Sequence, residues 1–455
     1  MLLLQYRTGL SDAQALEAVA WDLRWKIALG LPVDHRGWNS STLTRFRARL
    51  LLHGKERLAL EATLELAGEL GLLDRPAEQI VDSTPMLGAA ATQDTVRLVR
   101  SGVRKLIDAV ADADEDAARR LADGLEFDYA KPAEKPDCRW REKQERERML
   151  TRVAQDAERA LRAVEQADGL LEEGAVEEAH ALLRDLVGQD FDVDEDGVPR
   201  LHRGTRQGRI LSVHDPEMRH GRKSQHQRFD GYKLSAAATN TADPPDHGDR
   251  GRPRLRAGWP AGQEPDRHPA RRATARADLG RHRLRERPHR AELADREVDV
   301  LAPVPEAPVK DDRLAKRDFD IDLTAGTVTC PAGQVAEIRT EPSGKRRARF
   351  PKAACARCPL RSRCVQPSGG VRQVQIEPHE ELLIAARQAL DHPATAEHLR
   401  RTRPRIERLL GLLVRRYGAR KARYIGAAKT RLQALWAAAL VNLNPIDRAL
   451  SPGAA

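Results

Sequence analysis

The chain has 455 residues, of which 40% are hydrophobic and 32% are charged, so it is long enough for two or three domains with buried cores and is globular rather than disordered. Its formal net charge of +10 favours a polyanionic partner, nucleic acid first. The longest apolar runs, MLLL and LWAAALVNL, are too short to cross a membrane, and no signal-peptide pattern opens the chain. These features predict a soluble, cytoplasmic protein with no membrane partner.

Residues 8–72 carry the apolar spacing of three and four residues that is typical of helices. Ser11 is a candidate N-cap, and Ser41 or Thr42 begins a basic amphipathic helix. A series of short helices, the last of them rich in arginine, is typical of a helix-turn-helix-like module. An ordinary helical bundle with a solvated basic face explains the pattern equally well. In the DNA-binding interpretation, the contacts come from Arg45, Arg47 and Arg49.

The middle of the chain alternates short apolar runs with a long, charged helical segment. EQIVDST at 78–84 predicts a buried strand that carries Asp82 at its C-terminal end, where active sites of α/β sheets gather, although a strand-end aspartate is more often a turn residue. The other predicted elements are helices over 95–190, strands over 208–213 and 229–238 around a polar basic turn, a helix and then a strand over 290–305, a cysteine-bearing hairpin region over 319–365 and helices over 380–447.

Four of the five cysteines cluster, at Cys330, Cys355, Cys358 and Cys364. In a reducing compartment such a cluster indicates a metal rather than disulfides, and zinc takes four thiolates held on turns of this kind. The spacing therefore predicts a structural zinc site, with four free thiols as the alternative. A redox pair is disfavoured because no thioredoxin-like strand and helix surround the CxxC.

Glu407 is a single acid inside a basic stripe of the C-terminal helical segment. Arg403 and Arg400 precede it by four and seven residues and therefore share its side of the helix. A metal-binding carboxylate beside phosphate-binding arginines and a plain intrahelical ion pair fit this layout equally well. A second basic set is interleaved with Tyr417 and Tyr424, as a nucleic-acid groove favours; it comprises Arg415, Arg416, Arg420, Lys421 and Arg423.

Several of these stretches together resemble the DDE-type transposases of bacterial insertion sequences, in the subgroup with an N-terminal helical domain and a four-cysteine insertion. The resemblance covers almost the whole chain. It rests on LLLQYRTGLSDAQALEAVAWDLRWKIALGLP, STLTRFRARLL, IVDSTPM, ILSVHDPEMRHGRKS, FDGYKL, TCPAG with CARCPLRSRC, and RPRIERLLGLL.

The resemblance implies an α+β or α/β fold, in which an N-terminal helical domain precedes an RNase H-like mixed-sheet core with a helical insertion and a small zinc-binding insertion that carries the four cysteines. The expected domains are a helical DNA-binding domain at 1–75, the catalytic core at 76–317 with its helical insertion at about 95–200, the four-cysteine insertion at 318–370, and C-terminal helices at 371–455 that complete the core.

The family's chemistry implies roles for individual residues. Asp82 matches the first catalytic Asp and Glu407 the catalytic Glu; with a second Asp they hold two Mg²⁺ or Mn²⁺ ions for phosphodiester cleavage and strand transfer. The implied partner is double-stranded DNA of the terminal inverted repeats and the target site, bound by a homodimer or larger assembly at the nucleoid. The expected DNA contacts are Arg45, Arg47, Arg49, Arg222, Lys223, Arg400, Arg403, Arg415, Arg416, Lys421 and Arg423.

Two departures from the family pattern accompany the match. Family members carry the second Asp at a strand end in a motif like G-D-T-A-Y-G, which this chain lacks, and Asp278 is the nearest carboxylate in sequence. The match also starts at Met1, where family members have more helix before it, so a shortened N-terminus is expected. Loss of the second Asp predicts a transposase whose activity is impaired or absent; a DNA-binding remnant is the alternative.

Residues 245–290 have a composition unlike the rest of the chain. They contain 13 arginines but no lysine, isoleucine, valine, phenylalanine, tyrosine or serine, which excludes a buried strand and predicts disorder. Freely chosen codons for GRHRLRERP at 280–288, read one base over, give G-D-T-A-Y-G-N-G-P, and the same shift turns PDHGDRG at 245–251 into L-I-T-A-I-E. The composition therefore indicates two compensating frameshifts, near 244 and 290. A natural arginine-rich loop that binds DNA is the alternative.

Overall fold

The computed structural model describes residues 1–73, 78–223, 226–240, 254–258, 287–296, 298–302, 304, 313–365 and 370–451. The chain divides into two compact units. Unit 1 comprises Met1–Gln79, Ser83–Trp259 and Arg408–Ala455, and unit 2 comprises Ile80–Asp82 and Pro260–Glu407. The predicted N-terminal domain at 1–75 thus shares a unit with segments of the predicted core and with the end of the chain.

Five short helices lie at the start of unit 1, and three of them pack against the last helix of the chain. Ser11 caps the second of them through a capping box, because its hydroxyl accepts from the Gln14 N–H and its own N–H bonds the Gln14 side chain. The last helix, α16 (Ala427–Leu450), buries most of its small and apolar side chains and contacts α1, α4 and α5. The five helices are α1 (Leu2–Thr8), α2 (Asp12–Trp21), α3 (Leu23–Leu29), α4 (Thr42–Leu52) and α5 (Leu58–Glu69).

A β-sheet is built mostly from residues of unit 1, except for Ile80–Asp82 of its first strand. Its strand order is β1-β5-β4, with β6 also paired to β5. Gly231 of β5 has a φ of +149°, and a Cβ there would lie 2.2 Å from the Met86 carbonyl oxygen, so only glycine fits where β5 passes β1. The strands are β1 (Glu78–Leu87), β4 (Arg219–Arg222), β5 (Arg228–Asn240) and β6 (Arg254–Gly258).

The strands predicted at 78–84 and 229–238 are present as β1 and β5, but three details of this region differ from prediction. The first strand does not end at Asp82 but continues to Leu87, because Pro85 is tolerated in an edge strand. The supposed polar turn contains β4, which pairs with β5 as a hairpin. Within the arginine-rich stretch, which was predicted to be disordered and to lack a buried strand, Arg254–Gly258 forms β6 against Ser235–Thr239 through main-chain pairing. The rest of that stretch up to residue 286 lies outside the described residues.

Residues 208–213 also differ from prediction, because they are largely buried without forming a strand. Two side-chain amides take the main-chain hydrogen bonds that a neighbouring strand would have provided. Gln189 bonds both the N–H and the carbonyl of Ile210, and the Gln93 side chain accepts from the Val213 N–H. Side chains distant in sequence thus replace the main-chain hydrogen bonds that a neighbouring strand would make with residues 208–213.

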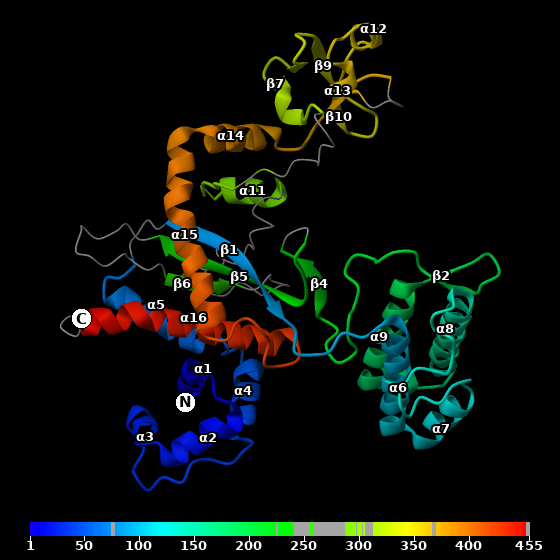
Figure 1. The fold of residues 1–455 in the computed structure, drawn as a ribbon, viewed down its shortest axis with the longest axis vertical. Helices are drawn as coiled ribbons and strands as arrows, with labels where there is room; N and C mark the ends of the chain where they lie inside the picture. The colour runs from blue at the N-terminus through cyan, green and yellow to red at the C-terminus, as the bar shows by residue number, and fades with distance from the viewer. Residues whose placement is uncertain are drawn as a thin grey trace. The chain divides into compact units, whose positions relative to one another are not determined.

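The helices predicted over 95–190 are confirmed and form a bundle within unit 1 (Figure 1). They are amphipathic and enclose a core that includes Val103, Leu106, Val153 and Leu183. The helices are α6 (Thr95–Ala113), α7 (Glu115–Asp123), α8 (Lys143–Glu165) and α9 (Gly174–Asp190), with the short pair β2 (Phe191–Val193) and β3 (Pro199–Leu201) after them.

Unit 2 contains a five-stranded antiparallel sheet in the cysteine region, followed by two helices. The sheet is β7 (Asp320–Asp322), β8 (Thr327–Thr329), β9 (Val335–Thr340), β10 (Arg346–Arg349) and β11 (Gln373–Ile376), with short helices α12 (Lys352–Ala356) and α13 (Arg361–Cys364) inserted before β11. The remaining helices are α11 (Arg287–Ala294), α14 (Glu380–Asp391) and α15 (Pro393–Arg415), the last of which continues into unit 1. The strand predicted after α11 is absent from the described residues 298–302.

Candidate functional site

Asp82 lies in the middle of β1 with its side chain buried. Its residue exposure is 8%, and it shares the buried face of the strand with Thr84 and Met86. A carboxylate held on a sheet in this way keeps its position because the strand on both sides is fixed by pairing and burial. The position is that of a rigidly held side chain rather than of a turn residue.

Glu407 lies on α15 with its side chain exposed to solvent. Its carboxylate pairs with Arg403 one turn earlier, at 2.9 Å between Nε and Oε1. The intrahelical ion pair considered from the sequence is therefore present. Because an exposed pair of this kind adds little stability, it leaves the carboxylate available for another ligand. Asp82 and Glu407 belong to the same compact unit.

The described residues do not assemble a metal centre. No group of three or more His, Cys, Asp or Glu side chains among them is arranged to hold a metal ion. Asp278, the nearest carboxylate to the missing motif, lies outside the described residues. Two carboxylates alone provide few of the oxygen ligands that Mg²⁺ needs, so the part of the site that the structure describes does not fit a pair of divalent ions.

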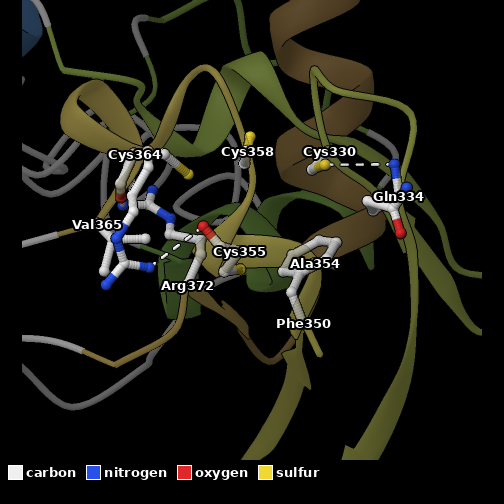
Figure 2. A pocket seen from close by; sticks show the side chains of 10 residues that line it. Cys330, Gln334, Phe350, Ala354, Cys355, Cys358, Cys364, Val365 and Arg372 are labelled. Carbon is white, nitrogen blue, oxygen red and sulfur yellow. Dashed lines mark hydrogen bonds between the residues drawn. The ribbon is translucent and has the colours of Figure 1, made fainter. Parts of the chain in front are cut away.

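The four clustered cysteines line one small cavity of about 20 Å³ beside Phe350 and Arg372 (Figure 2). All four are free thiols. The Cys330 sulfur accepts a hydrogen bond from the Gln334 N–H at 3.3 Å, in the turn between β8 and β9. Burial raises the pKa of the Cys364 thiol, and the nearby Cys355, Cys358 and Cys330 raise it further against the opposing charge of Arg372.

The predicted DNA contacts fall into three groups in the structure. Two pair with acids on their own helix, since Arg400 lies 3.2 Å from Glu397 and Arg403 pairs with Glu407. Two more, Arg47 and Arg423, form hydrogen bonds with other residues of the protein. The others are exposed, form no ion pair with any described residue and are free to meet phosphates: Arg45, Arg49, Arg222, Lys223, Arg415, Arg416 and Lys421.

Arg47 and Arg423 join the N-terminal helices to the start of α16. Arg47 is 7% exposed and binds Asp12 through both its terminal nitrogens. Its guanidinium lies 4.9 Å from the centre of the Tyr424 ring. Arg423 donates to the Leu10 carbonyl at 2.9 Å and lies over the Tyr6 ring. Both guanidinium groups therefore stabilise the fold instead of facing a ligand.

Tyr417 and Tyr424 do not line a groove, contrary to the sequence-based expectation. Tyr417 is 7% exposed and its hydroxyl bonds Asn444, while the Tyr424 hydroxyl bonds that of Tyr6 at 3.2 Å. Burial is the largest cause that raises the pKa of Tyr6, and its Tyr424 neighbour raises it further. The aromatic residues between the arginines thus stabilise the fold through internal contacts.

A buried cluster that sequence reasoning missed fixes the basic segment before α16. Asp215 is fully buried and accepts from the Tyr232 hydroxyl at 2.5 and 2.6 Å and from the Gly426 N–H at 3.3 Å. Glu217 accepts from the Ala427 N–H at 2.7 Å, so two acids cap the helix and favour its positive end. The DPE spacing in HDPEM was the only sequence signal. Burial, followed by the hydrogen bond and charge of Asp215, raises the pKa of Tyr232.

The same basic segment is fastened to the end of β1 by main-chain bonds. The Leu87 N–H donates to the Arg420 carbonyl at 2.9 Å, and the Ala422 N–H donates to the Leu87 carbonyl at 2.8 Å. Lys421, between them, keeps its side chain in solvent. The backbone that carries Lys421 is consequently held at a fixed position relative to the end of β1.

Comparison with known families gives two matches. Residues 329–446 match the family described as Transposase DDE domain, and residues 1–49 match the family described as Transposase domain (DUF772). No curated protein and no solved structure matches the chain. The two matches support a DNA transposase in general; such a domain implies DNA binding and dependence on divalent metal ions. In the described part of the chain no helix is long and apolar enough to cross a membrane.

Proposed function

We propose that this chain is an insertion-sequence transposase by descent, built to cut the ends of its element and join them to target DNA, and that it has lost its second catalytic aspartate. The observation that carries the proposal is that Glu407 lies inside the segment matching a Transposase DDE domain. Asp82 supports it, because a buried strand carboxylate is the kind of residue that holds a divalent ion rigidly. When bound, two such ions activate the attacking oxygen and stabilise the leaving one.

The DNA partner follows from the exposed cations. The exposed cations without ion-pair partners among the described residues are Arg45 and Arg49 on α4, Arg222 and Lys223 on the β4–β5 hairpin, and Arg415, Arg416 and Lys421. Such side chains neutralise phosphates and release counterions. The proposed partners are the DNA of the terminal repeats and of the target site. The chain would bind them as a homodimer or larger assembly at the nucleoid.

The frameshift hypothesis accounts for the missing aspartate. The nine residues at 280–288 correspond to G-D-T-A-Y-G-N-G-P when the chosen codons are read one base over. Of these nine, the structure describes Arg287 and Pro288, at the start of α11. The coding DNA tests this directly. A gene that does not read G-D-T-A-Y-G one base over removes the hypothesis and leaves an arginine-rich loop in its place.

A binding and cleavage assay on this chain tests the proposed function. We expect duplex DNA to bind with an affinity that falls steeply with salt, and no strand cleavage of element ends with Mg²⁺ or Mn²⁺. A chain that binds no DNA is not a transposase in any working sense. A chain that cleaves element ends at many turnovers has kept its activity, and the proposed impairment is then wrong.

We also propose that the four cysteines hold one structural zinc ion. Support comes from their shared cavity, their free thiol state and the soft ligand chemistry that zinc prefers. As described, the four thiols do not form a metal-holding group, so zinc binding requires their side chains to reorient.

Zinc removal should destabilise the cysteine-bearing sheet. We expect about one zinc per chain in the purified protein, lost in a Cys355→Ser/Cys358→Ser variant, and a melting temperature lowered by chelation. Elemental analysis and thermal melts measure both. Cys138→Ser is the matched control, since Cys138 lies in the helical bundle and should alter neither. A zinc-free protein whose melting is insensitive to chelator would contradict the proposal.

A further inference from the structure

The β4–β5 hairpin places two arginines directly opposite each other. Its register pairs Arg222 with Arg228 and His220 with Asp230. Residues opposite one another in an antiparallel pair point to the same face of the sheet, with Cβ atoms about 5 Å apart. One face of the hairpin therefore carries an unlike pair, His220–Asp230, and next to it a like pair of guanidinium groups.

The two pairs differ in how their charge is balanced. The His220 ring nitrogen lies 2.5 Å from an Asp230 oxygen. Arg222 and Arg228 are both exposed and neither forms an ion pair with a described residue. Asp230 is the one carboxylate between residues 219 and 231, and it is already engaged. Like charges directly opposite each other destabilise a hairpin. An anion would balance the two arginines, but no described residue of the protein supplies one.

The opposite face of the hairpin explains why the arrangement is rigid. The Phe229 ring covers Gly221 so closely that a Cβ on Gly221 would lie 2.2 Å from it. The Lys223 N–H donates to the Gln227 carbonyl at 2.8 Å and extends the pairing beyond the strands. With the backbone fixed on both sides, the Cα and Cβ atoms of the two arginines remain opposite each other, so both side chains can reach one anion.

We propose that Arg222 and Arg228 form a cross-strand clamp for a backbone phosphate of duplex DNA. A phosphodiester between the two guanidinium groups removes their repulsion and accepts charge-assisted hydrogen bonds from both. A two-stranded ribbon is also narrow enough to follow a DNA groove. The inference rests on the proposed function, which supplies DNA as the source of the phosphate, and adds Arg228 to the expected contacts.

The test uses the full chain and a duplex of about 30 base pairs, with affinity measured by fluorescence anisotropy across a KCl series. We expect Arg222→Gln/Arg228→Gln to weaken binding roughly tenfold and to lower the slope of log affinity against log salt by about 1 to 2. The matched control is Lys105→Gln/Arg184→Gln in the helical bundle. It removes the same charge from two exposed residues that form no ion pair with described residues, and should leave the slope nearly unchanged.

Thermal melting separates the clamp from a structural role. The hairpin variant should melt at or slightly above the wild-type temperature, because a repulsive pair has been removed. A lower melting temperature with unchanged DNA binding would overturn the clamp, as would equal effects of the hairpin and control variants. Inorganic phosphate that displaces DNA better than chloride at equal ionic strength would identify a free phosphate as the ligand instead. If the wild-type chain binds no DNA, the proposed function itself fails.

Discussion

Restoring the proposed reading frame between residues 244 and 290 should give this chain Mg²⁺-dependent strand cleavage, which we expect the present sequence to lack. Under the frameshift hypothesis, the segment that now reads GRHRLRERP would read G-D-T-A-Y-G-N-G-P in the restored chain. That change supplies the third carboxylate, and two metal ions held by three carboxylates are what in-line phosphodiester displacement requires. Cleavage of labelled element ends, with and without Mg²⁺, measures the gain.

Two substitutions in the restored chain test the roles proposed for the other carboxylates. Asp82→Asn and Glu407→Gln should each lower the cleavage rate on the order of 10³-fold or more, because each removes a ligand charge from the metal site. The thermal stability of Glu407→Gln should change little, since the ion pair that Glu407 makes with Arg403 is exposed.

Glu397→Gln is the matched control for Glu407. It lies on the same helix, is partly exposed and also pairs with arginines, namely Arg400 and Arg401. Loss of its charge should leave cleavage within about twofold. Equal losses in the two variants would mean that Glu407 acts only as an ion-pair partner. A restored chain that stays inactive with intact DNA binding would show that the frame does not account for the missing activity.

The parts of the fold that the sequence predicted well are those set by local patterns. The helices over 95–190 and the capping role of Ser11 depend on apolar periodicity and on hydrogen bonds between residues three apart. The failures arise from distant partners. Residues 208–213 look like a strand because they are apolar, but Gln93 and Gln189, which lie outside that segment, take their backbone bonds.

The candidate site shows the same limit. Residue type and spacing singled out Asp82 and Glu407, and the structure adds that one is buried and the other is exposed in an ion pair. Arginine content alone could not separate Arg45 from Arg47, two positions apart on one helix. Only the folded structure shows that Arg47 points inward to Asp12. The face on which a helical residue is buried depends on the elements that pack against that helix.

Arg47→Met should lower the free energy of unfolding by about 2 to 3 kcal/mol, the expected cost of leaving one member of a partly buried ion pair without its partner. The Arg47 side chain is 8% exposed and that of Asp12 is 32% exposed. The substitution also removes the cation from the face of Tyr424, a contact that links α4 to the segment before α16. Chemical denaturation at about pH 7 measures the change.

Arg45→Met is the control, and we expect it to affect DNA binding rather than stability. Arg45 lies on the same helix, is exposed and pairs with no described acid. Its loss should change stability by less than about 0.5 kcal/mol but lower the salt slope of DNA binding by about 1. Arg47→Met should leave that slope unchanged. A stable Arg47→Met protein with weakened DNA binding would contradict the internal role.

The pH dependence of this effect follows from Asp12. Burial opposes its ionisation, but hydrogen bonds from Arg47 and Gln5 outweigh burial and hold the pKa of Asp12 below its usual value. A carboxylate whose folded pKa is lowered stabilises the fold above its unfolded pKa, and this contribution disappears as pH falls through the folded pKa. The stability difference between wild type and Arg47→Met should therefore be constant from about pH 5 to 8 and shrink below about pH 4. A difference that persists undiminished at about pH 2 to 3 would mean that the arginine acts through packing against Tyr424 rather than through its pair with Asp12.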